Sequence, residues 1–343
     1  MSIQLAVWGG FFAAHAATQH FGFVSFPVVI LGVGLSVVSW LVSDLRYWAL
    51  FIGTTCFCAL IVIALLLPPE LNSIAVSCGG VVVFAFSISL VMGIALVDSV
   101  NESARRGQEL EQARQLQVSL LPASRPQLLA SDIAWQMETA TEVGGDYYDY
   151  SLTDDGTLTL CVGDATGHGM DSGVVVTGTK SLFQTFADAP SITDSLTIMS
   201  KSLKGMNLPR MGMAMTFLRM RNHACSVSSA GMPPVMIYRA GTGEVEEVEV
   251  SGFPLGLSAT ATYQEESFEV SPGDVILMLT DGLPERLNPK DEYFDYDRTK
   301  ALFAVAASGP PEAICDALLK GGEDWAEGRP QDDDITLVVL KAK

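Results

Sequence analysis

The chain has 343 residues, enough for one large domain or two smaller ones, and its formal net charge is −19. Residues 1–100 hold three of the 39 acidic and one of the 20 basic side chains, so 36 acidic and 19 basic ones remain for the rest. The chain is therefore an almost uncharged, apolar third joined to an acidic two-thirds. Because an acidic domain repels phosphate backbones, the composition argues against nucleic acid as a partner.

The six cysteines form neither a disulfide framework nor a zinc pattern. Three fall in apolar segments, three are scattered through the acidic part, and no CxxC pair or Cys/His spacing occurs. We interpret them as small buried hydrophobic residues, which suits a reducing cytoplasm for the acidic part. They are Cys56, Cys58, Cys78, Cys161, Cys225 and Cys315.

Residues 1–98 are predicted to form a transmembrane helical region. Three segments offer about 20 or more residues without a full charge, the length that crosses a hydrocarbon core. They are Phe21–Val42, Trp48–Leu67 and Ser73–Val97. A shorter segment, Leu5–Gln19, is a fourth candidate, so we expect three or four spans. This first segment lacks the basic start and the cleavage site of a secretory signal.

The few cations near these segments predict their orientation. Arg46 lies between the first two strong spans, and Arg105 and Arg106 follow the last one. Placing these arginines in the cytoplasm leaves Pro68–Asn72 outside, which agrees with the positive-inside tendency. The acidic domain is then cytoplasmic for either number of spans, and the chain is predicted to be a multi-pass membrane protein.

A linker helix is predicted over Ser99–Leu121, where Glu, Gln, Arg, Leu and Ala dominate and Pro122 ends the run. An imperfect apolar stripe runs along this helix, and its last four residues are spaced three and four positions apart. The stripe consists of Val100, Leu110, Ala113, Leu116 and Leu120. Two interpretations of residues 99–122 stay open. One is an amphipathic helix packed on its own domain, and the other is a signalling helix that forms a homodimer and carries membrane events to the acidic domain.

The soluble domain, residues 123–343, is organised around an apolar run that ends at Asp164 and is followed at once by the glycine-rich turn Ala165–Gly169. An aspartate at a strand end with flexible backbone beside it suits a metal or phosphate site, although such turns are common by themselves. The same pattern of an apolar run, an aspartate and a glycine recurs in Val275–Gly282, with Asp281 as the aspartate.

Two further acidic turns accompany these. Glu142–Asp149 has two glycines before Asp146, and Gln331–Leu340 has three aspartates before a β-branched strand. Like charges gathered in one crevice repel each other unless cations hold them. If the four turns meet, they predict hard divalent cations with oxygen ligands. Asp149 is interpreted as a structural hydrogen-bond acceptor rather than a ligand.

The other elements indicate antiparallel sheets with flanking helices. A series of short strands with turns at short intervals favours antiparallel sheets over a doubly wound parallel fold. The predicted strands are Met213–Met220, Ala224–Ser229, Val235–Arg239 and Glu244–Val250. The predicted helices are Asp171–Ala187, Ser191–Met206, Thr299–Ala307 and Pro311–Leu319, with Asp171-Ser172 and Ser191 as caps of the first two. Gly178-Thr-Lys180-Ser lacks the order of a P-loop.

In these motifs the chain resembles the metal-dependent phosphatases of the protein phosphatase 2C superfamily, in particular the bacterial sporulation-stage-II-E type, which includes regulators of stress sigma factors. The resemblance covers about residues 109–341 and depends on the order and spacing of several motifs. They are Glu109–Pro122, Glu142–Asp149, Val162–Gly169, Ser229–Pro234, Pro254–Leu257, Thr280–Gly282 and Asp333–Thr336. It implies an α+β fold, an α-β-β-α sandwich of two antiparallel sheets flanked by helices, preceded here by the all-α transmembrane region.

The resemblance also implies two Mn²⁺ or Mg²⁺ ions at one edge of the sandwich. The implied catalytic residues and metal ligands are Asp146, Asp164, Asp281 and Asp333, with the carbonyl of Ala165 as a further metal ligand. Asp334 would lie behind the ligands and Asp332 in solvent. Because three aspartates follow one another, an assignment of the ligand shifted by one residue stays open.

Two departures from the family pattern concern the general acid. Met232 stands where many members have a histidine after the Ala-Gly pair, and Thr166 stands where eukaryotic members have a proposed acid histidine. His168 is displaced from that position by two residues, so the acid role is not transferred to it. We expect His168 to make a turn hydrogen bond, with a phosphate contact as the alternative, and a water on the metal pair to protonate the leaving alkoxide.

The function implied by the resemblance is that of a protein serine/threonine phosphatase anchored in the bacterial inner membrane. Its substrate would be a phosphorylated regulatory protein such as an anti-sigma-factor antagonist. An alternative is a catalytically inactive, membrane-bound interaction module of the same fold, which would be expected to have lost an acidic ligand, and none is missing here. A transporter is disfavoured because the predicted spans contain few ionisable groups.

Overall fold

A computed structural model describes residues 69–140, 144–167 and 169–343 of the chain. By internal contacts the chain divides into two units, and Gly107–Lys343 form the one that contains the sheets. The helices are α4 (Pro69–Leu120), α5 (Met170–Phe186), α6 (Ile192–Gly205), α7 (Tyr296–Ala306) and α8 (Pro311–Ala326). The strands are β1 (Ser131–Glu138), β2 (Asp146–Leu152), β3 (Leu158–Ala165), β4 (Met213–Arg221), β5 (Ala224–Ala230), β6 (Val235–Tyr238), β7 (Val245–Val248), β8 (Glu266–Glu269), β9 (Val275–Leu279) and β10 (Ile335–Ala342).

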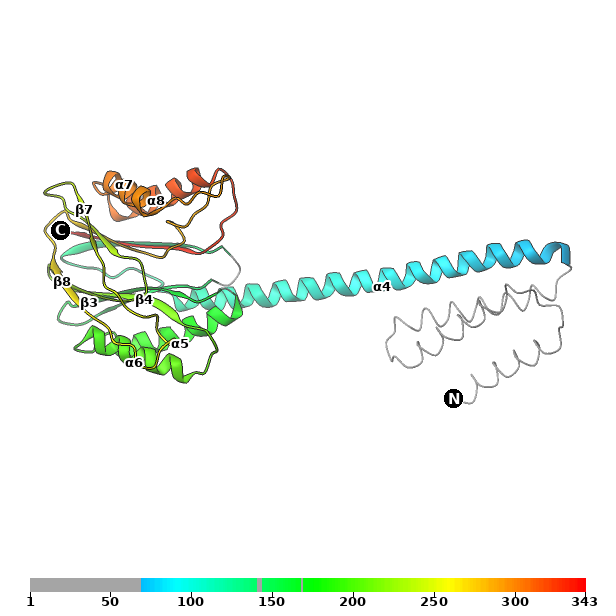
Figure 1. Cartoon of the computed structure of the whole chain (residues 1–343), viewed down its shortest axis with the longest axis horizontal. Helices are drawn as coiled ribbons and strands as arrows, with labels where there is room; N and C mark the ends of the chain where they lie inside the picture. Colours follow the sequence, from blue (N-terminus) through cyan, green and yellow to red (C-terminus); the bar gives the residue numbers. More distant parts are fainter. Residues whose placement is uncertain (1–68, 141–143, 168) are drawn as a thin grey trace. The chain divides into compact units, whose positions relative to one another are not determined.

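Two five-stranded sheets form the centre of this unit. Sheet A has the strand order β1-β10-β9-β6-β7, and sheet B has the order β2-β3-β4-β5-β8. Every described strand pair is antiparallel, as the short strand spacing predicts. Figure 1 shows the two sheets lying face to face, with α7 and α8 beyond one sheet and α5 and α6 beyond the other.

Three apolar clusters hold these layers together. Val162 of sheet B and Met278 of sheet A belong to the cluster between the sheets. Phe183 of α5 packs on Phe217 of β4 with ring centroids 5.4 Å apart, which fixes α5 on the outer face of sheet B. A third cluster joins α7 and α8 to sheet A. The predicted sandwich of two antiparallel sheets flanked by helices is therefore confirmed.

The sequence of β3 is mostly apolar because both faces of the strand are covered. Side chains alternate between the two faces of a strand, and here one face meets sheet A while the other meets α5. Each residue of β3 is consequently buried except Asp164, which is half-buried at the strand end. The aspartate is the point at which this strand reaches solvent.

Several predicted boundaries shift in the structure. The predicted cap of α5 at Asp171-Ser172 is wrong, because the helix begins at Met170 after Gly169, whose φ of 84° suits glycine, and no side chain caps it. The Ser191 cap of α6 is confirmed by its side chain, which accepts a hydrogen bond from the Asp194 amide at 3.1 Å. Helix α8 runs past the predicted end to Ala326. Strands β1, β2 and β8 were not predicted.

Three cysteines can be compared with their prediction. Cys161, Cys225 and Cys315 are buried and free, as predicted. The burial of the other cysteines lies outside the described side chains.

The N-terminal predictions are covered only in part. Leu5–Gln19, Phe21–Val42 and Trp48–Leu67 lie outside the described residues. Ser73–Val97 falls within α4, which continues without a break through the predicted linker helix to Leu120. Among the described helices, none has both the length and the apolar character needed to cross a membrane.

Candidate metal centre at the edge of the two sheets

Two predicted ligands face each other across sheet B. Strand β2 begins at Asp146, β3 ends one residue after Asp164, and the two aspartates are direct partners in the antiparallel ladder. Asp146 is buried, with 2% of its surface exposed, whereas Asp164 is half-buried. The β2–β3 pairing therefore brings together two carboxylates that lie 18 positions apart in the sequence.

Gly145 lies against a group of oxygen atoms beside this pair. A Cβ at Gly145 would lie 2.8 Å from the carbonyl oxygen of Ala165, 2.8 Å from Oδ1 of Asp164 and 3.2 Å from the carbonyl oxygen of Gly167. The Ala165 amide also donates a hydrogen bond to the Gly145 carbonyl at 2.9 Å. The absence of a side chain at position 145 thus leaves a small cradle formed by three acceptor oxygens.

Sheet A contributes the other two predicted turns at the same edge. Because β9 and β10 are antiparallel, Asp281 after the end of β9 lies beside Asp333 and Asp334 before the start of β10. The backbone comes close at this point, since a Cβ at Gly282 would collide with the carbonyl group of Asp334. Glycine is therefore required immediately after Asp281.

One side-chain hydrogen bond joins the two sheets at this edge. The hydroxyl of Thr280, which follows β9, donates to Oδ2 of Asp146 at 2.9 Å. The hydroxyl oxygen of Thr280 in turn accepts a hydrogen bond from the Thr336 amide of β10 at 2.9 Å. The acidic turns of sheet A and the acidic strand ends of sheet B consequently lie together at one edge of the sandwich.

The electrostatics of the site show an excess of negative charge. Burial, and after it the charges of Asp281, Asp333 and Asp334, raise the pKa of Asp164 to about 8. Burial also raises the pKa of Asp146 well above its usual range, with added contributions from Asp164 and Asp334. The pKa of Asp281 is raised by burial and by Glu285. A cation at this edge would relieve the repulsion that these shifts report.

The hydroxyl of Thr336 is a buried polar group beside this charge. Its Oγ1 makes no hydrogen bond of ordinary geometry with the described residues, although the hydroxyl is close enough to Asp146 to lower the pKa of that carboxyl. In the described part of the chain, no three His, Cys, Asp or Glu side chains form a group that could hold a metal ion. The structure thus places the predicted ligands at one edge without arranging their side chains as a finished coordination sphere.

Asp334 differs from the neighbouring predicted ligands because the backbone uses both of its oxygens. Oδ1 accepts from the Ala140 amide at 2.7 Å, and Oδ2 accepts from the Gly145 amide at 2.6 Å. Asp333 accepts from the Asp334 amide through Oδ1 at 2.8 Å. Asp332, expected in solvent, is 58% exposed at its side chain and lies 3.4 Å from Arg329. These contacts fit the register in which Asp334 stands behind the ligands.

Two other predicted residues can be located. Asp149 is a structural acceptor, as expected, and it receives hydrogen bonds from the Tyr147 hydroxyl at 2.6 Å, from Lys180 Nζ at 2.6 Å and from Gln184 at 3.0 Å. The Met232 amide donates to the Ser229 hydroxyl at 3.3 Å. His168 lies outside the described residues.

Gln117 near the end of α4 is a contact that the sequence analysis missed. Its side chain is buried, donates to the Gly144 carbonyl at 2.6 Å and accepts from the Gly144 amide at 3.1 Å. Gly144 adjoins the Gly145 cradle, so the last turns of α4 hold the loop that precedes Asp146. A polar residue in a glutamine-rich helix carries no signal that would have revealed this pairing.

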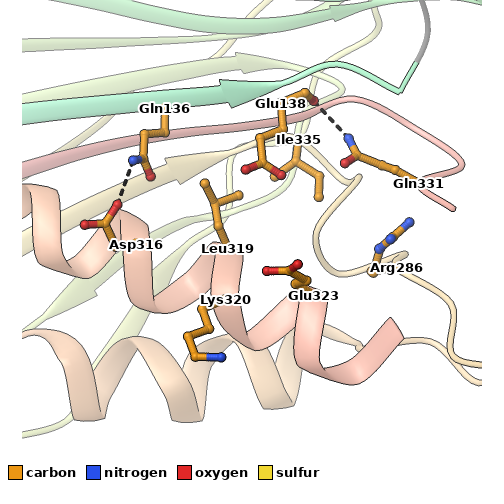
Figure 2. A pocket seen from close by; sticks show the side chains of 9 residues that line it. All are labelled: Gln136, Glu138, Arg286, Asp316, Leu319, Lys320, Glu323, Gln331 and Ile335. Atoms are coloured by element: carbon orange, nitrogen blue, oxygen red, sulfur yellow. Dashed lines mark hydrogen bonds between the residues drawn. The ribbon is translucent and has the colours of Figure 1, made fainter. Parts of the chain in front are cut away.

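A polar groove of about 450 Å³ lies between α8 and the adjacent end of sheet A (Figure 2). Gln136 donates to Asp316 across it at 2.7 Å, and Gln331 donates to the Glu138 carbonyl at 2.9 Å. None of the predicted ligands lines this groove. Its lining residues are Gln136, Glu138, Arg286, Asp316, Leu319, Lys320, Glu323, Gln331 and Ile335.

Comparisons with known proteins agree with this architecture. The chain is 25% identical over 262 residues to protein IcfG of Synechocystis, covering 68% of this chain and 41% of that protein. It is also 25% identical over 275 residues to the phosphoserine phosphatase RsbU of Bacillus subtilis, covering 75% of this chain and 78% of that protein. The alignment therefore spans less than half the length of IcfG.

The fold is also found in solved structures. The SiaA-PP2C domain of Pseudomonas aeruginosa superposes with a TM-score of 0.62 at 19% identity, over 70% of this chain and 98% of that domain. That likeness is one of fold. The family model described as stage II sporulation protein E matches residues 154–343, which is more than half of the chain. With the PP2C fold and this match together, the chain belongs to the stage II sporulation protein E family.

Proposed function

We propose that the chain is a protein serine/threonine phosphatase that uses two divalent cations, Mn²⁺ or Mg²⁺. The observation that carries the proposal is the meeting of acidic turns from both sheets at one edge, where burial and like charge raise the pKa values of Asp146, Asp164 and Asp281. Membership of the stage II sporulation protein E family and the likeness to a phosphoserine phosphatase supply the reaction class.

The residues present fit such cations chemically. Carboxylates and backbone carbonyls are the ligands that hard divalent cations prefer, and the cradle at Gly145 presents both types of oxygen. The buried hydroxyl of Thr336 adds a polar group beside Asp146, close enough to lower the pKa of that carboxyl. The residues that would hold the ions are Asp146, Asp164, Asp281 and Asp333, with the carbonyl of Ala165.

When bound, the cations would supply the positive charge that attracts and neutralises a phosphoryl group and would activate water for its hydrolysis. The chain itself contributes position and polarity. Its aspartates carry the negative charge that selects cations, and the backbone around Gly145 and Gly282 permits the close approach of the two sheets. Buried Asp334 and Thr280 hold the Gly145 amide and the Asp146 carboxylate in place.

The substrate class follows from the relatives. RsbU of Bacillus subtilis is described as a phosphoserine phosphatase, so we propose a phosphorylated serine or threonine on a bacterial regulatory protein, such as an anti-sigma-factor antagonist. We also propose that residues 1–98 anchor the chain in the inner membrane, with the phosphatase domain in the cytoplasm.

The linker helix is proposed to transmit a signal from the anchor to the site, with a homodimer through residues 99–121 as its assembly. Two observations support this role. The Gln117 side chain contacts the loop that precedes Asp146, and Leu116 is 70% exposed on the same helix, as an interface residue would be in a single copy.

The test is hydrolysis of a generic phosphate ester and of a phosphoserine peptide by the full-length chain, with manganese and with a chelator. We expect manganese-dependent hydrolysis of both, and its loss in Asp164→Asn and Asp281→Asn with the fold retained in circular dichroism. Absence of hydrolysis by the wild type under every metal condition would favour the inactive interaction module instead. Full activity in both variants would refute the ligand assignment.

A further inference from the structure

Thr280 belongs to the Thr280–Gly282 motif, but the predicted ligands of that motif give it no role of its own. It lies between the end of β9 and Asp281, and it is completely buried. Its hydroxyl contacts Asp146, which belongs to the other sheet. Among the predicted ligands, Asp146 is therefore oriented by a residue that stands next to a second predicted ligand.

The direction of this hydrogen bond is fixed by the hydrogen-bonding capacity of a hydroxyl group. A threonine side chain has a single proton to donate, and its oxygen can accept. The Thr336 amide donates to Oγ1 of Thr280 at 2.9 Å, so the hydroxyl proton is left for Oδ2 of Asp146, also at 2.9 Å. The bond thus fixes the rotation of the carboxylate through one of its two oxygens.

The backbone prevents Thr280 from moving away from this arrangement. The Thr280 amide donates to the Thr336 carbonyl at 3.1 Å, and the Thr336 amide returns to the Thr280 hydroxyl. The two threonines extend the β9–β10 ladder by one residue pair beyond Leu279 and Leu337. The donor that reaches Asp146 is consequently held by main-chain bonds of sheet A.

We propose that Thr280 is the positioning residue of the cation site: its hydroxyl sets the orientation of Asp146 and fixes the spacing between the ligands of sheet B and those of sheet A. This inference rests on the proposed metal-dependent function. Groups that hold a ligand from behind commonly change metal affinity by about 10- to 100-fold when they are removed.

The test compares Thr280→Val with Thr280→Ser in the full-length chain. Valine keeps the shape of threonine but removes the hydroxyl, whereas serine keeps it. Binding of Mn²⁺ is measured by the paramagnetic resonance signal of the free ion, independently of catalysis. We expect Thr280→Val to weaken binding by about 10- to 100-fold, and Thr280→Ser to bind close to wild type.

A matched control separates this role from the general cost of changing a buried threonine. Thr179 of α5 is completely buried, and its hydroxyl has no hydrogen-bond partner among the described residues. Thr179→Val should leave Mn²⁺ binding unchanged. A second readout is hydrolysis of a generic phosphate ester over a manganese titration, where Thr280→Val should raise the half-saturating manganese concentration more than it lowers the rate at saturation.

If Thr280→Val does not fold, Thr280→Cys replaces it, because a thiol is a weak donor of similar size. Its affinity should fall below that of Thr280→Ser. Wild-type affinity in Thr280→Val or Thr280→Cys, or an equal loss in Thr179→Val, would overturn the positioning role while leaving the proposed phosphatase intact. A wild-type chain that binds no Mn²⁺ and hydrolyses no ester would overturn the proposed function and this inference with it.

Discussion

Asp334 shapes the loop before Asp146 by accepting two backbone hydrogen bonds, one with each carboxylate oxygen. It is 5% exposed, and its bond to the Gly145 amide is buried, so water does not readily replace that bond. Asp334→Asn keeps the size of the side chain but retains one acceptor oxygen and places an NH₂ group against an N–H donor. We expect a loss of about 1–3 kcal/mol in the free energy of unfolding, measured by denaturant titration.

Asp332→Asn is the matched control, because it changes the same atoms in the same aspartate triplet. That side chain is 58% exposed, and its contact with Arg329 is long. Exposed ion pairs of this kind contribute little, so the control should change stability by no more than about 0.5 kcal/mol. Equal effects of the two substitutions would show that Asp334 does not hold the loop.

Gly145 is the position where an added methyl group is most informative. In Gly145→Ala the new Cβ would lie 2.8 Å from both the Ala165 carbonyl oxygen and Oδ1 of Asp164, closer than ordinary contact. The acceptor oxygens must then move apart, and we expect manganese-dependent hydrolysis to fall by at least about tenfold, as for a small misplacement at a catalytic site.

Gly205→Ala is the control for this substitution, because a Cβ there meets nothing within 4 Å. It should retain full activity. Wild-type hydrolysis in Gly145→Ala would mean that the cradle is not used by the site.

The residue scale also shows what the sequence could reveal about the site. Asp164 and Asp281 could be picked out because an apolar run, an acid and a glycine mark a strand end in the sequence itself, and Asp146 because two glycines precede it. Thr280 and Gln117 could not, because their roles depend on which sheet lies opposite and where a distant helix ends. The Thr280–Asp146 hydrogen bond spans 134 positions of the sequence and the Gln117–Gly144 bond spans 27, so neither leaves a local sequence pattern.

At the scale of elements, the end of α4 is the part whose contacts most affect the site. Gln117 exchanges two hydrogen bonds with the backbone of Gly144 and is 8% exposed. Gln117→Ala leaves a buried amide and a buried carbonyl of Gly144 without these partners. We expect a faster exchange of the Gly144 and Gly145 amide protons and a weaker affinity for manganese, measured by hydrogen exchange and by manganese titration.

Gln115→Ala is the control, because it removes the same type of side chain from the same helix. Gln115 is exposed and donates only to Glu111, one turn earlier, at 3.2 Å. It should leave both readouts unchanged. Unchanged exchange at Gly144 in Gln117→Ala would contradict the coupling between α4 and the site.

The elements themselves were mostly predictable, and the misses have physical causes. Apolar periodicity located α5, α6, α7 and β10 to within a few residues. Helix α8 was predicted too short because Gly321 and Gly322 read as a helix end, whereas a Cβ at Gly322 would lie only 2.6 Å from Leu283, so the glycine serves close packing. Strand β8 was missed because its Glu266–Glu269 sequence is polar and mostly exposed at a sheet edge.

At the scale of the whole molecule, the acidic edge predicts an unusual dependence of stability on pH. The folded-state pKa of Asp164 is about 8, above the ordinary aspartate value of about 3.9. The folded protein therefore holds this proton more tightly than the unfolded chain does. The stability gained by protonation is fully present below about pH 4 and is lost as pH rises through about 8.

We accordingly expect the chelator-treated chain to melt at a lower temperature at pH 8 than at pH 5, and manganese to reverse the loss at pH 8. Asp164→Asn should reduce this difference, because an amide does not titrate, and should stabilise the metal-free protein at pH 8 while abolishing hydrolysis. A melting temperature that does not change between pH 5 and pH 8 would contradict the crowding of negative charge at this edge.

The origin of the predicted ligands in two different layers has a mechanical consequence. Asp146 and Asp164 come from one sheet, and Asp281 and Asp333 flank the ends of two strands of the other. An ion shared between them would cross-link the two sheets. The occupancy of the ion site and the sliding of one sheet over the other would then be thermodynamically linked. A movement of one sheet relative to the other would then weaken binding of the ion, and binding of the ion would oppose that movement.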